Sequence, residues 1–145
     1  MPRSALLLCV AVALPVAALA QGDPRAAGES HPLIGKWRWT VKPTACTETY
    51  DFRTDGTAQV VSGDERSDNT FTVSRQPDGK GFYKLDMTIT KDHGGKDCTD
   101  AASDDTGQHH TNYILFEPSR EMYISCADAT LDKCFGPLKR IGTDR

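Results

Sequence analysis

The sequence is poor in apolar residues beyond its N-terminus, and it lacks an excess of positive charge. Residues 1–20 hold 16 of the 55 apolar residues, which leaves 39 in the other 125 positions, or about 31%. The formal net charge of -3 argues against a dedicated nucleic-acid-binding protein, because such proteins normally present a strongly basic face. With 145 residues, the chain has room for one domain and little more.

Sequence motifs for metal binding and catalysis are also missing. There is no Cys-x-x-Cys pair and no His-x3-5-His spacing of the kind that holds zinc. His109 and His110 are adjacent in a predicted strand, so they point to opposite faces and cannot clamp one metal ion. The acidic residues of segment 91–108 do not follow the ligand order of a calcium loop, and no serine lies in a nucleophile-elbow sequence. We therefore expect no metal, no cofactor and no enzymatic activity.

The apolar N-terminus has the layout of a secretory signal peptide. A basic start precedes the apolar run 5–14, which Pro15 breaks. Ala18 and Ala20 then place small residues at the two positions that a signal peptidase reads. The alternative is a membrane anchor, but the run is short for a bilayer, which needs roughly 20 apolar residues.

Cleavage after residue 20 would divide the chain into three parts. These are a signal peptide (1–20), a disordered polar lead-in broken by glycine and proline (21–32), and a single folded domain (33–145). Because no second apolar stretch follows, we expect a mature protein without a membrane span. We expect it to be a monomer that is secreted or periplasmic.

Cysteine usage agrees with export. Removal of Cys9 with the signal peptide leaves four cysteines, and an even number in an exported domain indicates two disulfides. Three pairings of these cysteines are possible. We favour Cys126 with Cys134, which closes a short polar loop, and Cys46 with Cys98, which ties an early strand to the long polar loop 91–108.

From Leu33 onward the apolar residues recur with a period of two, which is typical of strands. Asp55-Gly56 and other glycine- or proline-containing turns separate the runs. We expect strands at 35–41, 46–53, 57–62, 70–75, 82–90, 109–117, 121–126 and 135–141, with a polar turn at 63–68. This order predicts an all-β fold, a small antiparallel eight-stranded up-and-down barrel, whose closure removes exposed sheet edges.

Several short motifs resemble those of small lipocalin-like (calycin-type) β-barrel proteins secreted by bacteria. Gly35-Lys36-Trp37 is similar to the Gly-x-Trp signature that opens such barrels, and residues 52–57 resemble their Phe-x-x-Asp-Gly-Thr hairpin. Residues 134–138 look like the closing motif of members with four cysteines. The resemblance implies a lipocalin-like barrel in which Gly35, Trp37 and Arg140 are structural, with the Arg140 cation packed over the tryptophan ring.

Four aromatic residues and one carboxylate are candidate ligand-binding residues, because their alternation places them on inferred inner faces. They are Trp37, Trp39, Glu48, Tyr50 and Tyr83. The aromatic rings could line an apolar pocket, and Glu48 could hold a ligand amine or an internal cation. The alternative is that the rings form an ordinary core and that Glu48 lies at the wetted barrel rim.

These features predict an exported binding protein for a small apolar or amphipathic ligand. The alternative is a solid barrel that binds a protein partner, as a periplasmic inhibitor or immunity factor, through loop 91–108. The volume of the interior distinguishes the two hypotheses, because ligand sites typically measure about 300–1,000 Å³.

Overall fold

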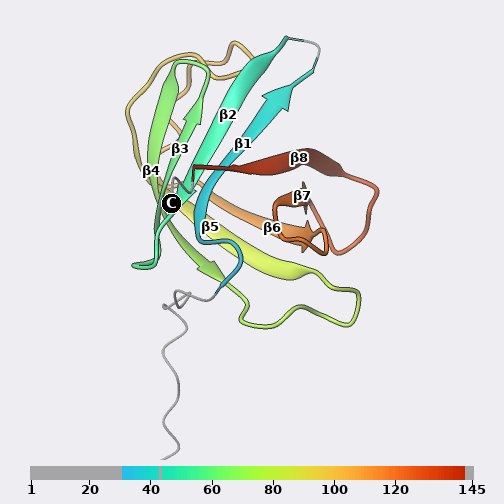
Figure 1. The fold of residues 1–145 in the computed structure, drawn as a ribbon. Coiled ribbons are helices and arrows are strands. Elements are labelled where there is room, and N and C mark those ends of the chain that lie inside the picture. Colours follow the sequence, from blue (N-terminus) through green and yellow to red (C-terminus); the bar gives the residue numbers. More distant parts are fainter. Residues whose placement is uncertain (1–30, 43, 143–145) are drawn as a thin grey trace, which may run out of the picture.

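A computed structural model of the chain describes residues 31–42 and 44–142. Eight strands form a closed antiparallel barrel in which each strand pairs with its sequence neighbours and the last pairs with the first (Figure 1). The predicted all-β, up-and-down, eight-stranded barrel is confirmed. The strands are β1 (Gly35–Val41), β2 (Cys46–Phe52), β3 (Thr57–Ser62), β4 (Glu65–Val73), β5 (Tyr83–Asp92), β6 (His109–Phe116), β7 (Met122–Cys126) and β8 (Cys134–Ile141).

The expected signal peptide and most of the expected lead-in lie outside the described residues. His31 and Pro32 are described, and both contact the barrel. The His31 ring lies within hydrogen-bond distance of the Ser74 carbonyl oxygen, at 3.3 Å, and the Pro32 carbonyl accepts a hydrogen bond from Arg140. The ordered domain therefore includes the last two residues of the segment 21–32.

The beginning of β4 differs from the sequence prediction. Residues 63–68, which we expected as a polar turn, form a two-residue turn and the first part of β4, with Ser62 paired to Glu65. No apolar residue marks this part of the strand, which is why the alternation of side chains was missed. Ser67 and Asn69 are buried at inward positions, whereas Arg66 is exposed. The inward face of this strand is thus polar at one end of the barrel.

The two ends of the barrel differ. At the end that carries the β2–β3, β4–β5 and β6–β7 turns, Leu33 and Trp37 are completely buried. The Trp37 Nε1 donates a hydrogen bond of 2.8 Å to the Leu33 carbonyl, and its ring meets the Tyr123 ring at 4.7 Å between centroids. The Arg140 guanidinium lies 4.1 Å from the centroid of the Trp37 ring. We call this the closed end and the opposite one the open end.

Two disulfides cross-link residues at the open end. They are Cys46–Cys98 and Cys126–Cys134, which is the pairing that we favoured from the sequence. The first ties the loop 93–108 to the start of β2, and the Asp64 N–H also donates to the Lys96 carbonyl at 2.9 Å. Figure 1 shows this loop beside the β3–β4 hairpin. Disulfides are typical of proteins in oxidising, extracytoplasmic environments. Within the described ranges, no helix is long and apolar enough to cross a bilayer.

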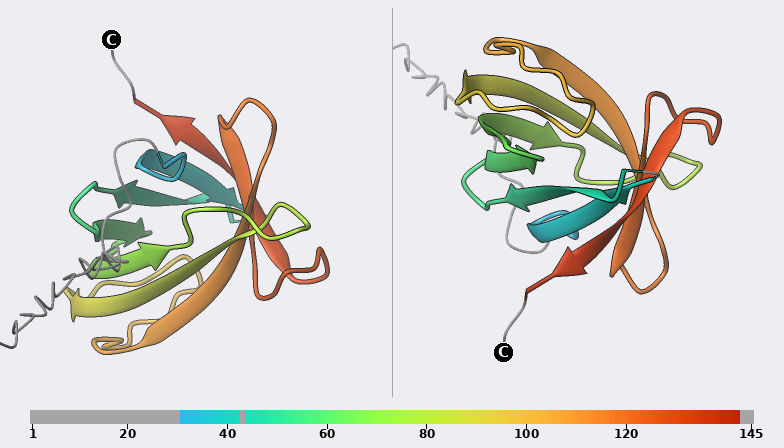
Figure 2. Two further views of the ribbon diagram at one scale, coloured as in Figure 1. Left: turned by 90° about the horizontal axis from the view of Figure 1, so that it is seen from below. Right: turned by 90° about the horizontal axis from the view of Figure 1, so that it is seen from above.

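β1 and β8 close the barrel, but they pair over a short length. β1 pairs with β2 along all seven of its residues, whereas in the described part only Lys36, Trp37 and Arg38 pair with β8. Beyond Arg38 the two strands diverge, as Figure 1 and the end-on views in Figure 2 show. Among the described residues, the junction between the first and last strands therefore has the fewest paired positions in the ring.

Candidate functional site

A cavity of about 260 Å³ occupies the barrel interior at the open end. Its floor, toward the closed end, is apolar and includes Phe52, Leu85, Met87 and Tyr123. Its wall and mouth are polar and include Glu48, Ser62, Glu65, Ser67, Asn69, Asp97, His110, Asn112 and Ser125. The floor of the cavity is thus apolar, whereas its wall and mouth combine these polar groups with Val60, Ile89 and Phe135.

The polar wall is built from polar residues at inward positions of β4 and β7. Ser67, Asn69 and Ser125 are less than a tenth exposed. The Asn69 side-chain amide donates to the Ser67 hydroxyl oxygen at 3.0 Å, and every buried side-chain nitrogen or oxygen in the described ranges has a hydrogen-bond partner. A period-two reading of Ser67, Asn69, Phe71 and Val73 as one face would have revealed this wall from the sequence.

Glu48 is the best-positioned acidic group in the cavity. Its Oε2 accepts a hydrogen bond of 2.7 Å from the Tyr50 hydroxyl, and its Oε1 accepts one of 2.9 Å from the Ser62 hydroxyl. The Ser62 oxygen in turn accepts the Cys98 N–H at 3.1 Å, which links the carboxylate to the disulfide-bonded loop. A carboxylate offers about four acceptor positions. These two donors therefore orient Glu48 and leave acceptor capacity toward the cavity.

The chemistry of Tyr50 is set by its surroundings. Burial, and then the neighbouring negative charge of Glu48, raise the pKa of Tyr50 well above its ordinary range. The phenol consequently stays protonated at neutral pH and acts as a hydrogen-bond donor to Glu48. Burial alone raises the pKa of Tyr123 in the cavity floor, so this ring also stays neutral.

A second group of carboxylates lies at the mouth. Glu65, Asp92 and Asp105 each offer an oxygen, and these oxygens lie within 4.8 Å of one another. Backbone N–H groups of Asp105 and Gly94 bind Asp92 and lower the pKa of its carboxyl group. Burial, followed by the charges of Asp92, Asp97 and Asp105, raises the pKa of Glu65. These three side chains are the described residues that could offer oxygen ligands to a cation.

Glu65→Gln is expected to give a small increase in melting temperature at pH 7. Folding raises the pKa of Glu65 above its ordinary value of 4.5, so ionisation of this group opposes folding at higher pH. Below that ordinary value the group is protonated in both folded and unfolded states, and the advantage of glutamine should disappear. Thermal unfolding of both proteins between pH 3 and pH 8, followed by circular dichroism, measures the difference.

The substitution Asp92→Asn removes a carboxyl group whose pKa shifts on folding in the opposite direction to that of Glu65. Folding lowers the pKa of Asp92, so its ionised form stabilises the native state above the ordinary pKa of 3.8, and this contribution is lost as the pH falls through the lowered value. The asparagine variant should melt below the wild type at pH 7. If both variants shifted the melting temperature in the same direction at pH 7, the assignment of opposite roles to the two carboxylates would be wrong.

The structure separates the five candidate ligand-binding residues. Glu48 and Tyr50 line the cavity. Trp37 lies in the core of the closed end. Trp39 and Tyr83 are partly buried and pack against other aromatic rings without lining the cavity. The polarity of the cavity is therefore determined more by Glu48 and the polar wall than by the aromatic residues that we expected to line it.

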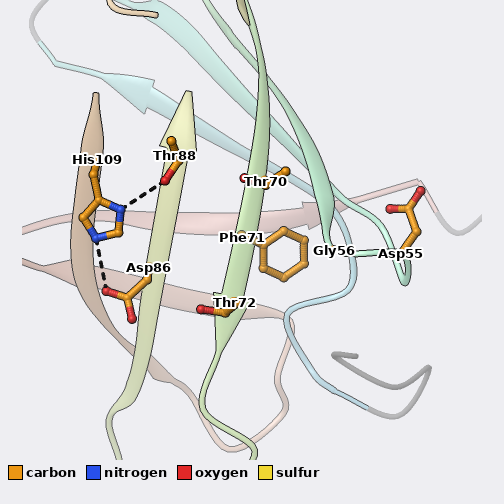
Figure 3. Close-up of a pocket in the computed structure, with 8 residues that line it drawn as sticks. All are labelled: Asp55, Gly56, Thr70, Phe71, Thr72, Asp86, Thr88 and His109. Atoms are coloured by element: carbon orange, nitrogen blue, oxygen red, sulfur yellow. Dashed lines mark hydrogen bonds and ion pairs between the residues drawn. The ribbon is translucent and has the colours of Figure 1, made fainter. Parts of the chain in front are cut away.

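A second depression, of about 340 Å³, lies on the outer face of β4, β5 and β6 (Figure 3). His109 lines it, whereas His110 lines the interior cavity, so the two adjacent histidines do face opposite ways. His109 Nδ1 lies 3.1 Å from the Thr88 hydroxyl, and Nε2 lies 3.6 Å from Asp86. The His109 side chain is 57% exposed and Asp86 is already paired with Lys84 at 2.9 Å, so water and Lys84 compete for these groups. We assign no chemistry to this face.

Gly35, Trp37 and Arg140, which we expected to be structural, come together at the closed end. Gly35 has a φ of 124°, and a Cβ at this position would lie 2.8 Å from Nη1 of Arg140. The absence of a side chain at Gly35 thus lets the guanidinium reach over Trp37 and donate to the Ile34 carbonyl at 3.0 Å. A scan against protein-family models, a search of curated proteins and a search of solved structures found no match to this chain.

Proposed function

We propose that this protein is an exported binding protein that holds a small amphipathic cation in the barrel cavity and performs no catalysis. One observation carries the proposal. The cavity lining contains the carboxyl groups of Glu48, Glu65 and Asp97 above an apolar floor, and it contains no lysine or arginine. An ammonium group in such a cavity would form charge-assisted hydrogen bonds to carboxylate oxygens, while its hydrocarbon part would contact the floor.

The hydrogen bonds around Glu48 support this ligand class. Tyr50 and Ser62 fix the carboxylate before any ligand arrives, which reduces the entropic cost of binding. The cavity of about 260 Å³ is slightly below the usual range of about 300–1,000 Å³, so the ligand should be smaller than a drug-sized molecule. The alternative hypothesis, protein binding through loop 91–108, assumes a solid barrel. A barrel with an interior cavity of this size differs from that assumption.

Export is supported by the N-terminal pattern and by the two disulfides. The resemblance of Gly35, Trp37 and Arg140 to lipocalin-like proteins supports the same proposal, because it implies a barrel of the kind that encloses small ligands. The proposal therefore joins an extracytoplasmic location, secreted or periplasmic, to a binding role.

Three probes of equal chain length test the ligand class. We expect hexylammonium to bind and to raise the melting temperature, because its charge and its alkyl chain match the two parts of the cavity. Hexanol should bind more weakly, and hexanoate should not bind, because its carboxylate would face Glu48. Titration calorimetry and thermal unfolding measure the three affinities. Equal binding of hexanoate and hexylammonium would contradict a cationic ligand.

Glu48→Gln tests the role of the carboxylate. Hydrogen bonds to charged groups contribute roughly 1.5–3 kcal/mol, so this variant should bind hexylammonium at least about tenfold more weakly, with little change in melting temperature. Glu117→Gln is the matched control, because Glu117 lies at the closed end and does not line the cavity. A large loss of stability with unchanged affinity would instead show that Glu48 serves only a structural network.

A further inference from the structure

The diverging part of β1 and β8 forms a second, external groove, which we call the seam. It has a volume of about 630 Å³ and is lined by residues 38–40 and Lys42 on the β1 side and by Gly136, Pro137 and residues 139–141 on the β8 side. Residues 39–41 of β1 extend past its last pairing partner in the described part of β8. Figure 1 shows β8 turning away from β1 along this stretch. In the part of the chain that the structure describes, the seam is therefore open along the edge of β1.

The seam is strongly basic, in contrast to the acidic chain. Arg38, Lys42 and Lys139 are exposed, and none of them takes part in an ion pair within the described residues. No acidic residue of ranges 31–42 and 44–142 lines the groove, although the formal net charge of the chain is -3. Its fourth cation, Arg140, is committed to the Trp37 ring and to backbone carbonyls. Among the described residues, three positive charges thus remain without a counter-charge.

Two of these cations face one another directly. Arg38 lies opposite Lys139 in the β1–β8 register. Like charges at directly opposed positions of an antiparallel pair destabilise the pair. The protein therefore carries an electrostatic penalty at the strand junction that closes its barrel, and a negative charge placed across the seam would relieve it.

The backbone and the aromatic residues of the seam favour an extended chain as the partner. An open strand edge presents N–H and C=O groups to which a further strand can be added. Trp39 lines the groove and packs against Phe135, with 4.9 Å between ring centroids. Side chains on alternate positions of an added strand could contact this aromatic surface while the others face the cations.

We propose that the seam binds an acidic, extended segment of a partner protein, which adds to β1 and places its carboxylates opposite Arg38, Lys42 and Lys139. This proposal is independent of the cavity ligand, because the seam lies outside the barrel. Trp39 and Phe135 stand between the two sites, since Trp39 lines the seam and Phe135 lines the cavity. Occupation of the seam would also continue the hydrogen bonding of β1 beyond its short pairing with β8.

The test uses a fluorescein-labelled peptide of alternating glutamate and valine, with binding followed by fluorescence anisotropy at low ionic strength. We expect the peptide to bind the wild type. Two comparison peptides separate the components of recognition. Replacing glutamate with lysine removes the complementary charge, and replacing valine with proline keeps the charge but removes backbone donors. Both peptides should bind at least about tenfold more weakly.

Lys139→Glu should weaken binding of the acidic peptide at least about tenfold. The same substitution should raise the melting temperature of the free protein, because Arg38 then faces a carboxylate. The melting temperature therefore shows whether weaker binding of the peptide comes from the lost charge or from an unfolded variant. Lys133→Glu is the matched control. It makes the same charge change at an exposed position outside the seam, and it should leave the affinity unchanged.

Three results would overturn the proposal. The first is equal binding of the acidic peptide to wild type and to Lys139→Glu. The second is equal binding of the proline-containing peptide or of inorganic polyphosphate, which would mean that the seam attracts any polyanion and recognises no strand. The third is concentration-dependent dimerisation of the wild type that the peptide abolishes, as sedimentation velocity would detect, because a second copy of the chain would then be the occupant.

Discussion

Trp37→Ala should lower the free energy of unfolding by about 3–5 kcal/mol, the usual cost of truncating a large buried aromatic residue. Trp37 is completely buried, donates a hydrogen bond to Leu33, and contacts the ring of Tyr123 and the guanidinium of Arg140. Removal of the indole would leave a cavity, and the Leu33 carbonyl would lose the hydrogen bond that the indole donates. Small domains have about 5–15 kcal/mol of stability in total. Urea denaturation followed by tyrosine fluorescence and far-ultraviolet circular dichroism measures the loss.

Trp39→Ala is the internal control, since Trp39 sits two residues away on the same strand but is only partly buried. It should cost clearly less stability than Trp37→Ala. Trp37→Phe should fall between the two, because it keeps a ring in the core while removing the indole donor to Leu33. A cost for Trp37→Ala no greater than that for Trp39→Ala would contradict the placement of the core at the closed end.

Removal of the Cys46–Cys98 disulfide, by Cys46→Ser with Cys98→Ser, is expected to cost about 4 kcal/mol. The two cysteines are 52 residues apart, and a cross-link that closes a long loop removes much conformational entropy from the unfolded chain. The variant should also lose protection of loop 93–108, because this bond ties the loop to β2. Chemical denaturation gives the stability, and amide hydrogen exchange reports on the loop.

The second disulfide supplies the comparison. Cys126 and Cys134 are separated by 8 residues, so the double serine variant should lose only about 2.6 kcal/mol by the same loop-entropy relation. Its effect on hydrogen exchange should stay near the β7–β8 connection. If this short bridge proved the more stabilising one, the loop-entropy explanation would not account for the stability of the barrel.

The strands were predictable where apolar residues alternate and turn sequences separate them. β1 and β3 have the predicted bounds, and seven of the remaining boundaries moved by only one or two residues. The prediction failed in the first half of β4, where inward residues such as Ser67 and Asn69 are polar. Period-two patterns are visible only when the two faces differ in polarity, and a strand that faces a polar cavity lacks this contrast.

The candidate site was less predictable than the fold. Glu48 could be singled out because it interrupts an otherwise apolar face of one strand, and this signal is local. Its partner Ser62 is 14 residues away, and the pair depends on the β2–β3 register. Asn112 and Ser125 face the same cavity only because the barrel closes. Predicting contacts of this kind requires knowledge of how the whole sheet curves.

The separation of β1 from β8 in the sequence also has a consequence for biogenesis. β8, which pairs with β1, is the last of the eight described strands to leave the ribosome. No closed ring can form before β8 has emerged, and the edge of β1 stays uncovered until then. An unfinished or truncated chain that ended before β8 would present this edge to chaperones and proteases, so quality control can distinguish complete copies from incomplete ones.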